Sequence, residues 1–230
     1  MKKLFFILTN LFIIAEASQV SAANPCDEIA VNPTINLTTS FGKLRYDFTK
    51  NIKELTKLSG KYGIIEQGLF ASGLAAIGVE WEIEVNTISK VVGSFDICTI
   101  PSTIDIFVGF SDPVIYVSRD LEEGSCEYEL VMRHERTHQQ INKTALEYFA
   151  PLMKEAFKEV ARNIPAHRVD SISKIDVATE VLTEKYMREI EPIINNFKKE
   201  IALEQSKLDS HTNYQLEGDL CKSFPKSKKR

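Results

Sequence analysis

The sequence predicts an α+β fold in which an N-terminal antiparallel, β-rich part is followed by a long antiparallel helix hairpin. Between residues 41 and 118, short β-branched and alternating segments follow one another, as they do in strands. Beyond Gly124, apolar residues recur every three or four positions, as they do on one face of a helix. Hydrophobic residues make up 43% of the 230 residues and no internal repeat is visible, so we expect residues 23–230 to form a single domain.

Three segments have the pattern of strands. Residues 79–85 alternate apolar and acidic side chains, which is typical of a strand with one buried face. Residues 103–108 and 113–117 are rich in β-branched and aromatic side chains. Because Gly109 and Asp112 lie between them, we expect these two segments to be adjacent strands joined by a tight turn.

Two long helices are expected after the strands. Ser125 is a candidate N-cap of the first helix, since its hydroxyl can accept a hydrogen bond from the first turn. One face of this helix carries Leu130, His134, His138, Ile141 and Ala145. We expect Pro151 to kink or restart the helix, and residues 163–173 to form a connection. A second helix is expected from about Lys174, with a kink at Pro192.

Residues 1–22 have the features of a secretory signal peptide. Lys2 and Lys3 precede an apolar run of about a dozen residues, and small residues lead to Ala22, after which we expect cleavage. The apolar run is shorter than the roughly 20 residues of a transmembrane helix, so we expect no stable membrane span after cleavage. The lysine- and isoleucine-rich composition is typical of a bacterial protein, which predicts a periplasmic or secreted location.

Four cysteines follow the predicted signal peptide, namely Cys26, Cys98, Cys126 and Cys221. An even number in an exported chain predicts two disulfides. None of the four forms a Cys-x-x-Cys pair, which argues against a zinc ribbon or a thioredoxin-type redox site. The helix hairpin brings the start of its first helix near the chain beyond its second helix. We therefore expect a Cys126–Cys221 disulfide, which leaves Cys26 to pair with Cys98.

Several functional classes find no support in the sequence. A net charge of −4 provides no basic excess to neutralise phosphates, so we expect no nucleic-acid partner. Residues 68–73 have the glycine spacing of a P-loop, but Leu74 follows where a lysine is required. The basic residues of 222–230 are expected to form a frayed, solvated tail. The sequence leaves the oligomeric state and the identity of the substrate open.

The chemistry is carried by a His-Glu-x-x-His motif at residues 134–138. On a helix His134 and His138 lie on the same face, with Cβ atoms roughly 5–6 Å apart. Two imidazoles placed in this way can bind one Zn²⁺ ion, which is the cofactor we expect. Glu135 lies beside such an ion without binding it, which is the position of a general base that takes a proton from water.

A catalytic zinc site needs a third protein ligand, and the spacing leaves three candidates for it. If the helix hairpin turns near residue 168, His134 and His138 face residues 198–202 of the second helix. Glu204 lies on the apolar face of the second helix, at about the position of residues 198–202. Asp209 and His211 lie two to three helical turns beyond the middle of residues 198–202. The hairpin geometry alone does not choose among Glu204, Asp209 and His211.

The order of parts resembles that of the zincin metallopeptidases: strands, a helix with the His-Glu-x-x-His motif, and a long return helix. More loosely, the chain is similar to a bacterial family of predicted secreted zinc-dependent proteases, whose return helix ends in Asp-x-x-Thr-x-His. Here Asp209 and Thr212 match that segment, and Tyr214 stands at the position of the family's histidine. The resemblance favours Asp209 as the third ligand, with Glu204 and His211 as alternatives. It leaves Tyr214 as a ligand, an oxyanion stabiliser or a packing residue.

The motif and the resemblance together predict an exported zinc-dependent hydrolase, an endopeptidase or amidase of the bacterial envelope. Glu135 is its expected general base, and its expected substrate is a peptide or a peptidoglycan-like molecule. Two alternatives stay open at this point. One is a non-catalytic envelope protein that retains a zincin scaffold for partner or metal binding. The other is a disulfide-stabilised structural domain with buried histidines.

Overall fold

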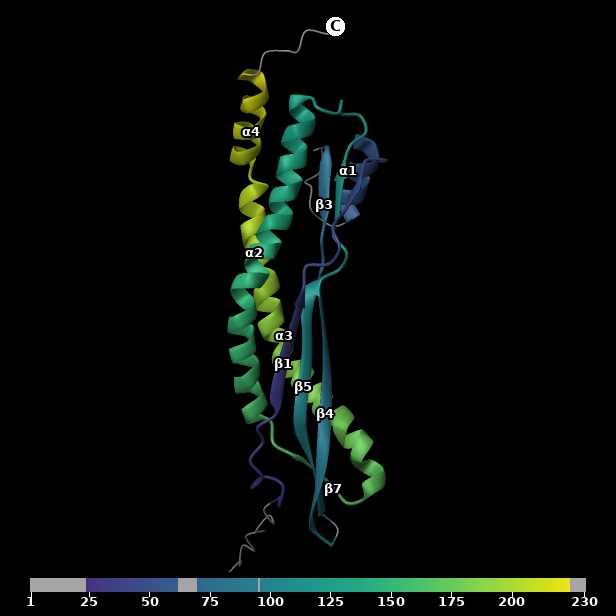
Figure 1. Ribbon diagram of the computed structural model, residues 1–230, viewed down its shortest axis with the longest axis vertical. Helices are drawn as coiled ribbons and strands as arrows, with labels where there is room; N and C mark the ends of the chain where they lie inside the picture. Colours follow the sequence, from purple (N-terminus) through teal and green to yellow (C-terminus); the bar gives the residue numbers. More distant parts are fainter. Residues whose placement is uncertain (1–23, 62–69, 95, 224–230) are drawn as a thin grey trace, which may run out of the picture.

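The computed structural model describes residues 24–61, 70–94 and 96–223 (Figure 1). The predicted signal peptide lies outside the described residues, as does all of the predicted basic tail except residues 222 and 223. The described elements are β1 (Thr34–Ser40), β2 (Arg45–Asp47), α1 (Ile52–Lys61), β3 (Gly73–Ala76), β4 (Val79–Gly93), β5 (Asp96–Phe110), β6 (Val114–Val117), α2 (Cys126–Asn163), β7 (His167–Val169), a 3-10 turn (Ile172–Lys174), α3 (Ile175–Leu208) and α4 (His211–Ser223).

The predicted α+β class is confirmed, since strands fill the N-terminal half and long helices follow them. The sheets are mixed, however, and not purely antiparallel. In the larger sheet the strand order is β1-β5-β4, with β7 also paired to β5. Here β1 runs parallel to β5, and β4 and β7 run antiparallel to it. The smaller sheet has the order β2-β6-β3, with β2 parallel and β3 antiparallel to β6.

The expectation that residues 103–108 and 113–117 form adjacent strands is wrong. The first segment belongs to β5, and the second belongs to β6 in the other sheet. The reason is that both edges of β5 are occupied along residues 103–109, one by β1 and the other by β4. The chain therefore leaves β5 at Phe110 without reversing against it, and pairs elsewhere.

The hydrophobic core lies between the larger sheet and the helices α2 and α3. Residues 79–85 of β4 turn their apolar side chains inward, as the alternation predicts, and leave Glu80, Glu82 and Glu84 exposed. Figure 1 shows α2 along most of the molecule, with α3 returning from the opposite end to lie beside it. The largest fully buried side chains of the core include Ile104, Ile106, Leu146, Phe157, Leu182, Tyr186, Ile190, Ile194 and Phe197.

The helix boundaries follow the predicted signals closely. The Ser125 hydroxyl caps α2 by accepting a hydrogen bond from the Tyr128 backbone N–H at 3.1 Å. The helix does not restart at Pro151, because helical geometry continues to Asn163. Likewise α3 continues through Pro192 to Leu208. No helix in the described ranges is long and apolar enough to cross a membrane.

Both predicted disulfides are confirmed. Cys26 is joined to Cys98 at the end of the molecule that holds β7, and Cys126 is joined to Cys221 at the end that holds α4 (Figure 1). Two disulfides indicate an oxidising, extracellular-type environment, because thiols are kept reduced in the cytosol.

Candidate metal centre

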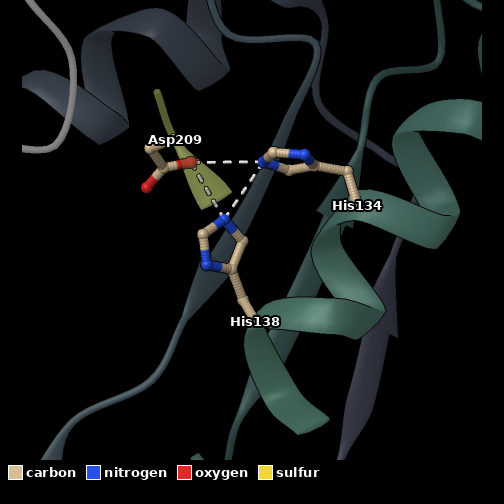
Figure 2. A group of neighbouring side chains, drawn as sticks. All are labelled: His134, His138 and Asp209. Atoms are coloured by element: carbon tan, nitrogen blue, oxygen red, sulfur yellow. Dashed lines mark hydrogen bonds and ion pairs between the residues drawn. The ribbon is translucent and has the colours of Figure 1, made fainter. Parts of the chain in front are cut away.

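Two imidazoles of α2 and one carboxylate beyond α3 form a compact cluster (Figure 2). Because His134 and His138 are one helical turn apart, both rings leave α2 on the same side, with centroids 4.8 Å apart. Asp209 is the C-cap of α3, so its side chain projects from the end of that helix. Its Oδ1 atom lies 3.2 Å from His134 Nε2 and 3.1 Å from His138 Nε2.

The three atoms of this cluster fit a metal ion. The two Nε2 atoms are 3.1 Å apart, so they form a nearly equilateral triangle with Asp209 Oδ1. A tetrahedral ion with bonds of about 2.0–2.1 Å separates its ligand atoms by about 3.3 Å, which is close to these distances. Two imidazoles and a carboxylate are also a donor set that zinc accepts.

Gln205, one turn before Asp209, determines the tautomer of His138. The Gln205 amide Nε2 donates to the His138 carbonyl oxygen at 3.1 Å and to Asn142 Oδ1 at 2.8 Å. Both partners accept only, so the other end of the amide, Gln205 Oε1, must accept from His138 Nδ1. The proton of the neutral imidazole is therefore on Nδ1, and the lone pair of Nε2 is directed at the cluster.

Glu217 of α4 determines the tautomer of His134, as Gln205 determines that of His138. Its Oε2 accepts a hydrogen bond from His134 Nδ1 at 2.9 Å, and its Oε1 lies 4.0 Å from the Arg133 guanidinium. His134 is only 4% exposed, so its ring is held between this carboxylate and the cluster. A carboxylate behind a histidine fixes the ring and increases its basicity as a ligand.

Glu135 lies beside the cluster but is not part of it. Its side chain is 7% exposed and packs against β3, where a Cβ atom at position 73 would come within 2.6 Å of Glu135 Oε1. Only glycine therefore fits at Gly73 without displacing Glu135. The backbone N–H of Ala75 donates a hydrogen bond to the Glu135 carboxylate. Burial raises the pKa of Glu135, nearby imidazoles lower it, and the balance is a pKa of about 7.

The other groups of the cluster have shifted pKa values as well. Burial lowers the pKa of His134, but the hydrogen bond to Asp209 and the nearby carboxylates outweigh burial and raise it overall. The same balance raises the pKa of His138, helped by Gln205. Burial raises the pKa of Asp209, but the hydrogen bonds from both imidazoles hold it well below its usual range. Without a metal, the cluster therefore favours an ionised Asp209 beside protonated imidazoles.

Tyr214 of α4 covers one side of the cluster. Its hydroxyl donates a hydrogen bond to Asp209 Oδ1 at 2.9 Å. Its ring stacks on His134, with centroids 5.1 Å apart and planes 24° apart. Burial and the neighbouring Asp209 charge raise the pKa of Tyr214, so the phenol stays protonated. Tyr214 therefore lies within reach of the site, and its assignment as an oxyanion stabiliser stays a prediction.

The two alternative ligands do not join the cluster. Glu204 is exposed and forms an ion pair with Lys207. His211 is exposed and exchanges a hydrogen bond with Gln215 at 2.9 Å. The hairpin estimate fell short of the true level although the connection itself, residues 164–174, lies close to its predicted place, so the two helices do not face one another symmetrically about it. With His138 opposite Gln205, the hairpin is centred near residues 171–172 and not near 168.

Three positions around the cluster were missed from the sequence, namely Asn142, Gln205 and Glu217. Each is a polar residue on a helix, which on sequence grounds reads as a solvated side chain. One signal was present: Gln205 is one turn before Asp209, and Asn142 is one turn after His138, so both share a face with the motif residues. For Glu217 the signal was indirect: it is one turn before Cys221, which the predicted disulfide joins to the start of the helix that carries the motif.

No family model, curated protein or solved structure matches the chain. The chemistry of the site is therefore argued from its own atoms.

Proposed function

We propose that the chain is an exported zinc-dependent hydrolase that cleaves peptide or related amide bonds in the bacterial envelope. The observation that carries this proposal is the buried Glu135, with its pKa near 7, beside a His134, His138 and Asp209 cluster that fits a metal ion. Zinc in particular is favoured by the donor set and by the His-Glu-x-x-His spacing. Export is favoured by the predicted signal peptide and by the two disulfides.

The proposed reaction divides the work among residues of the site. His134, His138 and Asp209 would hold the zinc ion, which would supply a Lewis acid for the carbonyl and lower the pKa of water toward about 7. Glu135 takes a proton from the attacking water and delivers it to the amide nitrogen, so that the C–N bond breaks into a carboxylic acid and an amine. The Tyr214 hydroxyl, which donates to Asp209 Oδ1, is the proposed donor for the oxygen that gains charge.

A peptide substrate is favoured by the position of β3. This strand is at the end of the order β2-β6-β3, and it packs against Glu135 through Gly73. The Ala75 N–H points at Glu135 instead of at a neighbouring strand. An extended peptide that adds to such an edge by backbone hydrogen bonds would pass directly in front of the proposed base.

The test is Glu135→Gln, which keeps the shape of the side chain and removes the base. The purified wild type is expected to hold one zinc per chain and to hydrolyse a peptide library or peptidoglycan fragments. Glu135→Gln is expected to hold the same zinc and to lose hydrolysis by at least about a hundredfold. Equal hydrolysis by the two proteins would contradict the proposal.

A second candidate function is non-catalytic zinc binding on the same scaffold. The specific observation in its favour is that Tyr214 is already hydrogen-bonded to Asp209 Oδ1, which places a fourth protein side chain beside the cluster. A closed site with four protein ligands binds metal without catalysis. Cobalt substitution separates the candidates, because the visible spectrum of an open site responds to small anions such as azide whereas a closed site does not.

A further inference from the structure

The helix α4 reaches the metal centre without being anchored in a hydrophobic core. It contributes Tyr214 and Glu217, which contact Asp209 and His134. Along residues 211–222 the most shielded positions are Asn213, Glu217 and Cys221, which are spaced by four and form one stripe, and Tyr214 is half exposed. No apolar residue in the described part of α4 is buried, and Leu216 is 63% exposed.

A helix of this kind does not hold its position by itself. With 13 residues, α4 is at the length where an isolated helix is only marginally stable in water. Burial of apolar surface normally supplies the missing stability, and α4 has no buried apolar residue in its described part. Beyond its polar contacts, the described part of α4 is attached by the stacking of Tyr214 on His134, by the peptide link to Asp209 at its start and by the disulfide from Cys221 to Cys126 at its end.

The Cys126–Cys221 disulfide is placed to fix the polar contacts of α4. Cys221 is one turn after Glu217, on the same stripe. Cys126 is the first residue of α2, about two turns before His134. The disulfide therefore aligns α4 with the first turns of α2, and this alignment brings Glu217 to His134.

The two disulfides differ in their access to solvent. Cys26 and Cys98 are both 0% exposed and are packed with Ile100 and Ala166. Cys126 and Cys221 are both partly exposed. A thiol reagent in solution therefore reaches the disulfide next to the metal centre, whereas the other one is protected by the fold.

We propose that the Cys126–Cys221 disulfide is a redox gate of the metal centre. In the oxidised chain it holds α4 on α2, so that Glu217 fixes His134 and Tyr214 covers Asp209. When it is reduced, α4 separates and both contacts are lost, which weakens metal binding. This inference rests on the proposed metal-binding function and adds its regulation.

The chemical step is thiol–disulfide exchange with an external disulfide. The Cys126 and Cys221 thiols lose two protons and two electrons as their S–S bond forms, and the external disulfide takes these up to become a dithiol. The reverse step, with a dithiol as reductant, opens the gate. A chain in a reducing compartment thus has a weak metal site, and the site is completed when the chain enters an oxidising one.

The experiment compares zinc affinity in the wild type and in the C126S/C221S double variant, by competition with a chromophoric chelator and without any thiol reductant. Loss of a carboxylate behind a metal-binding histidine typically costs 10–100-fold in affinity, so the double variant is expected to bind zinc about 10–100-fold more weakly. Equal affinities would overturn the proposal. The variant is expected to fold, because no described side chain of α4 belongs to the main hydrophobic core.

A matched variant tests whether the gate acts through Glu217. With the disulfide intact, Glu217→Ala is expected to weaken zinc binding by a similar factor. In the C126S/C221S background the same substitution is expected to change the affinity less than threefold, since Glu217 has already left His134. Full additivity of the two effects would overturn the mechanism.

Hydrogen exchange gives a readout that needs neither metal nor activity. In the metal-free C126S/C221S variant, backbone amides of residues 211–222 are expected to exchange faster than in the wild type, while those of α2 and α3 stay protected. Unchanged protection of α4 would overturn the proposal. A chain whose zinc affinity depends on the disulfide but which hydrolyses no substrate would support the gate and contradict the proposed hydrolase.

Discussion

The two helices that follow the connection, α3 and α4, serve the same site by different means. Seven buried residues fix α3 in the core: Ala178, Leu182, Tyr186, Ile190, Ile194, Phe197 and Ile201. The described part of α4 buries no apolar residue and is held by a disulfide and by polar contacts to the cluster. The difference shows that the position of Asp209 is set by the core, whereas the positions of Tyr214 and Glu217 are set by a covalent link and by the site itself.

The comparison predicts that stability depends on α3 and not on α4. Phe197→Ala removes a fully buried ring from the core and is expected to lower the free energy of unfolding by about 3–5 kcal/mol. Leu216→Ala on the exposed face of α4 is expected to change it by less than about 0.5 kcal/mol. Urea denaturation of the metal-free chain measures both, and similar losses for the two variants would contradict the comparison.

The pH dependence of the metal-free chain is expected to reflect Glu135. The pKa of Glu135 is about 7 in the folded chain against an ordinary value of 4.5, so between these values the folded chain binds more protons than the unfolded one. The free energy of unfolding therefore falls as the pH rises through this window, by an amount on the order of 3 kcal/mol. The raised pKa values of His134 and His138 act in the same direction above pH 6.5.

Denaturation in the presence of a chelator, at intervals from pH 5 to pH 8, measures this slope. Glu135→Gln is the control, because it keeps the buried shape and cannot ionise, so its profile is expected to be flatter. A wild-type stability that rises from pH 5 to pH 7 would show that the burial of Glu135 is wrongly described.

The smallest expected effect is the loss of zinc affinity on replacing Gln205, which lies on α3. Gln205→Ala removes the hydrogen bond that places a proton on His138 Nδ1, without touching the core. Zinc affinity is expected to fall by about 10-fold, at the lower end for such partners, because Asp209 and both imidazoles stay in place. Chelator competition measures this change. A loss that depends on the state of the Cys126–Cys221 disulfide would mean that α3 and α4 are not independent.

The sequence could predict those features that depend on local periodicity or local chemistry. The fold class, the Ser125 cap, the two histidines on one face and both disulfide pairings follow from spacing along the chain. The partners of β5 could not be predicted in this way, because β1 and β5 pair residues that are 69 positions apart. A tight turn after residue 108 was the simpler interpretation of the sequence. The structure excludes it, because β1 and β4 already occupy the two edges of β5.

Within the site, the same limit separates what was predicted from what was not. Asp209 was favoured by a resemblance, and the hairpin geometry alone left it among three candidates. Gln205 and Glu217 were not predicted as site residues, because their roles depend on which atoms they contact in the folded chain. The spacing of an amide and a carboxylate on a helix does not reveal which atoms they meet until the opposite helix is in place.

The pairing of the cysteines also bears on how the chain acquires its native form. Each disulfide joins cysteines that are consecutive in the sequence, with separations of 72 and 95 residues. A chain that emerges from a membrane pore N-terminus first therefore presents Cys26 with Cys98 as its sole partner before Cys126 arrives. In a chain exported in this way, the order of emergence would select the correct pairing, so oxidation during passage would need no later isomerisation.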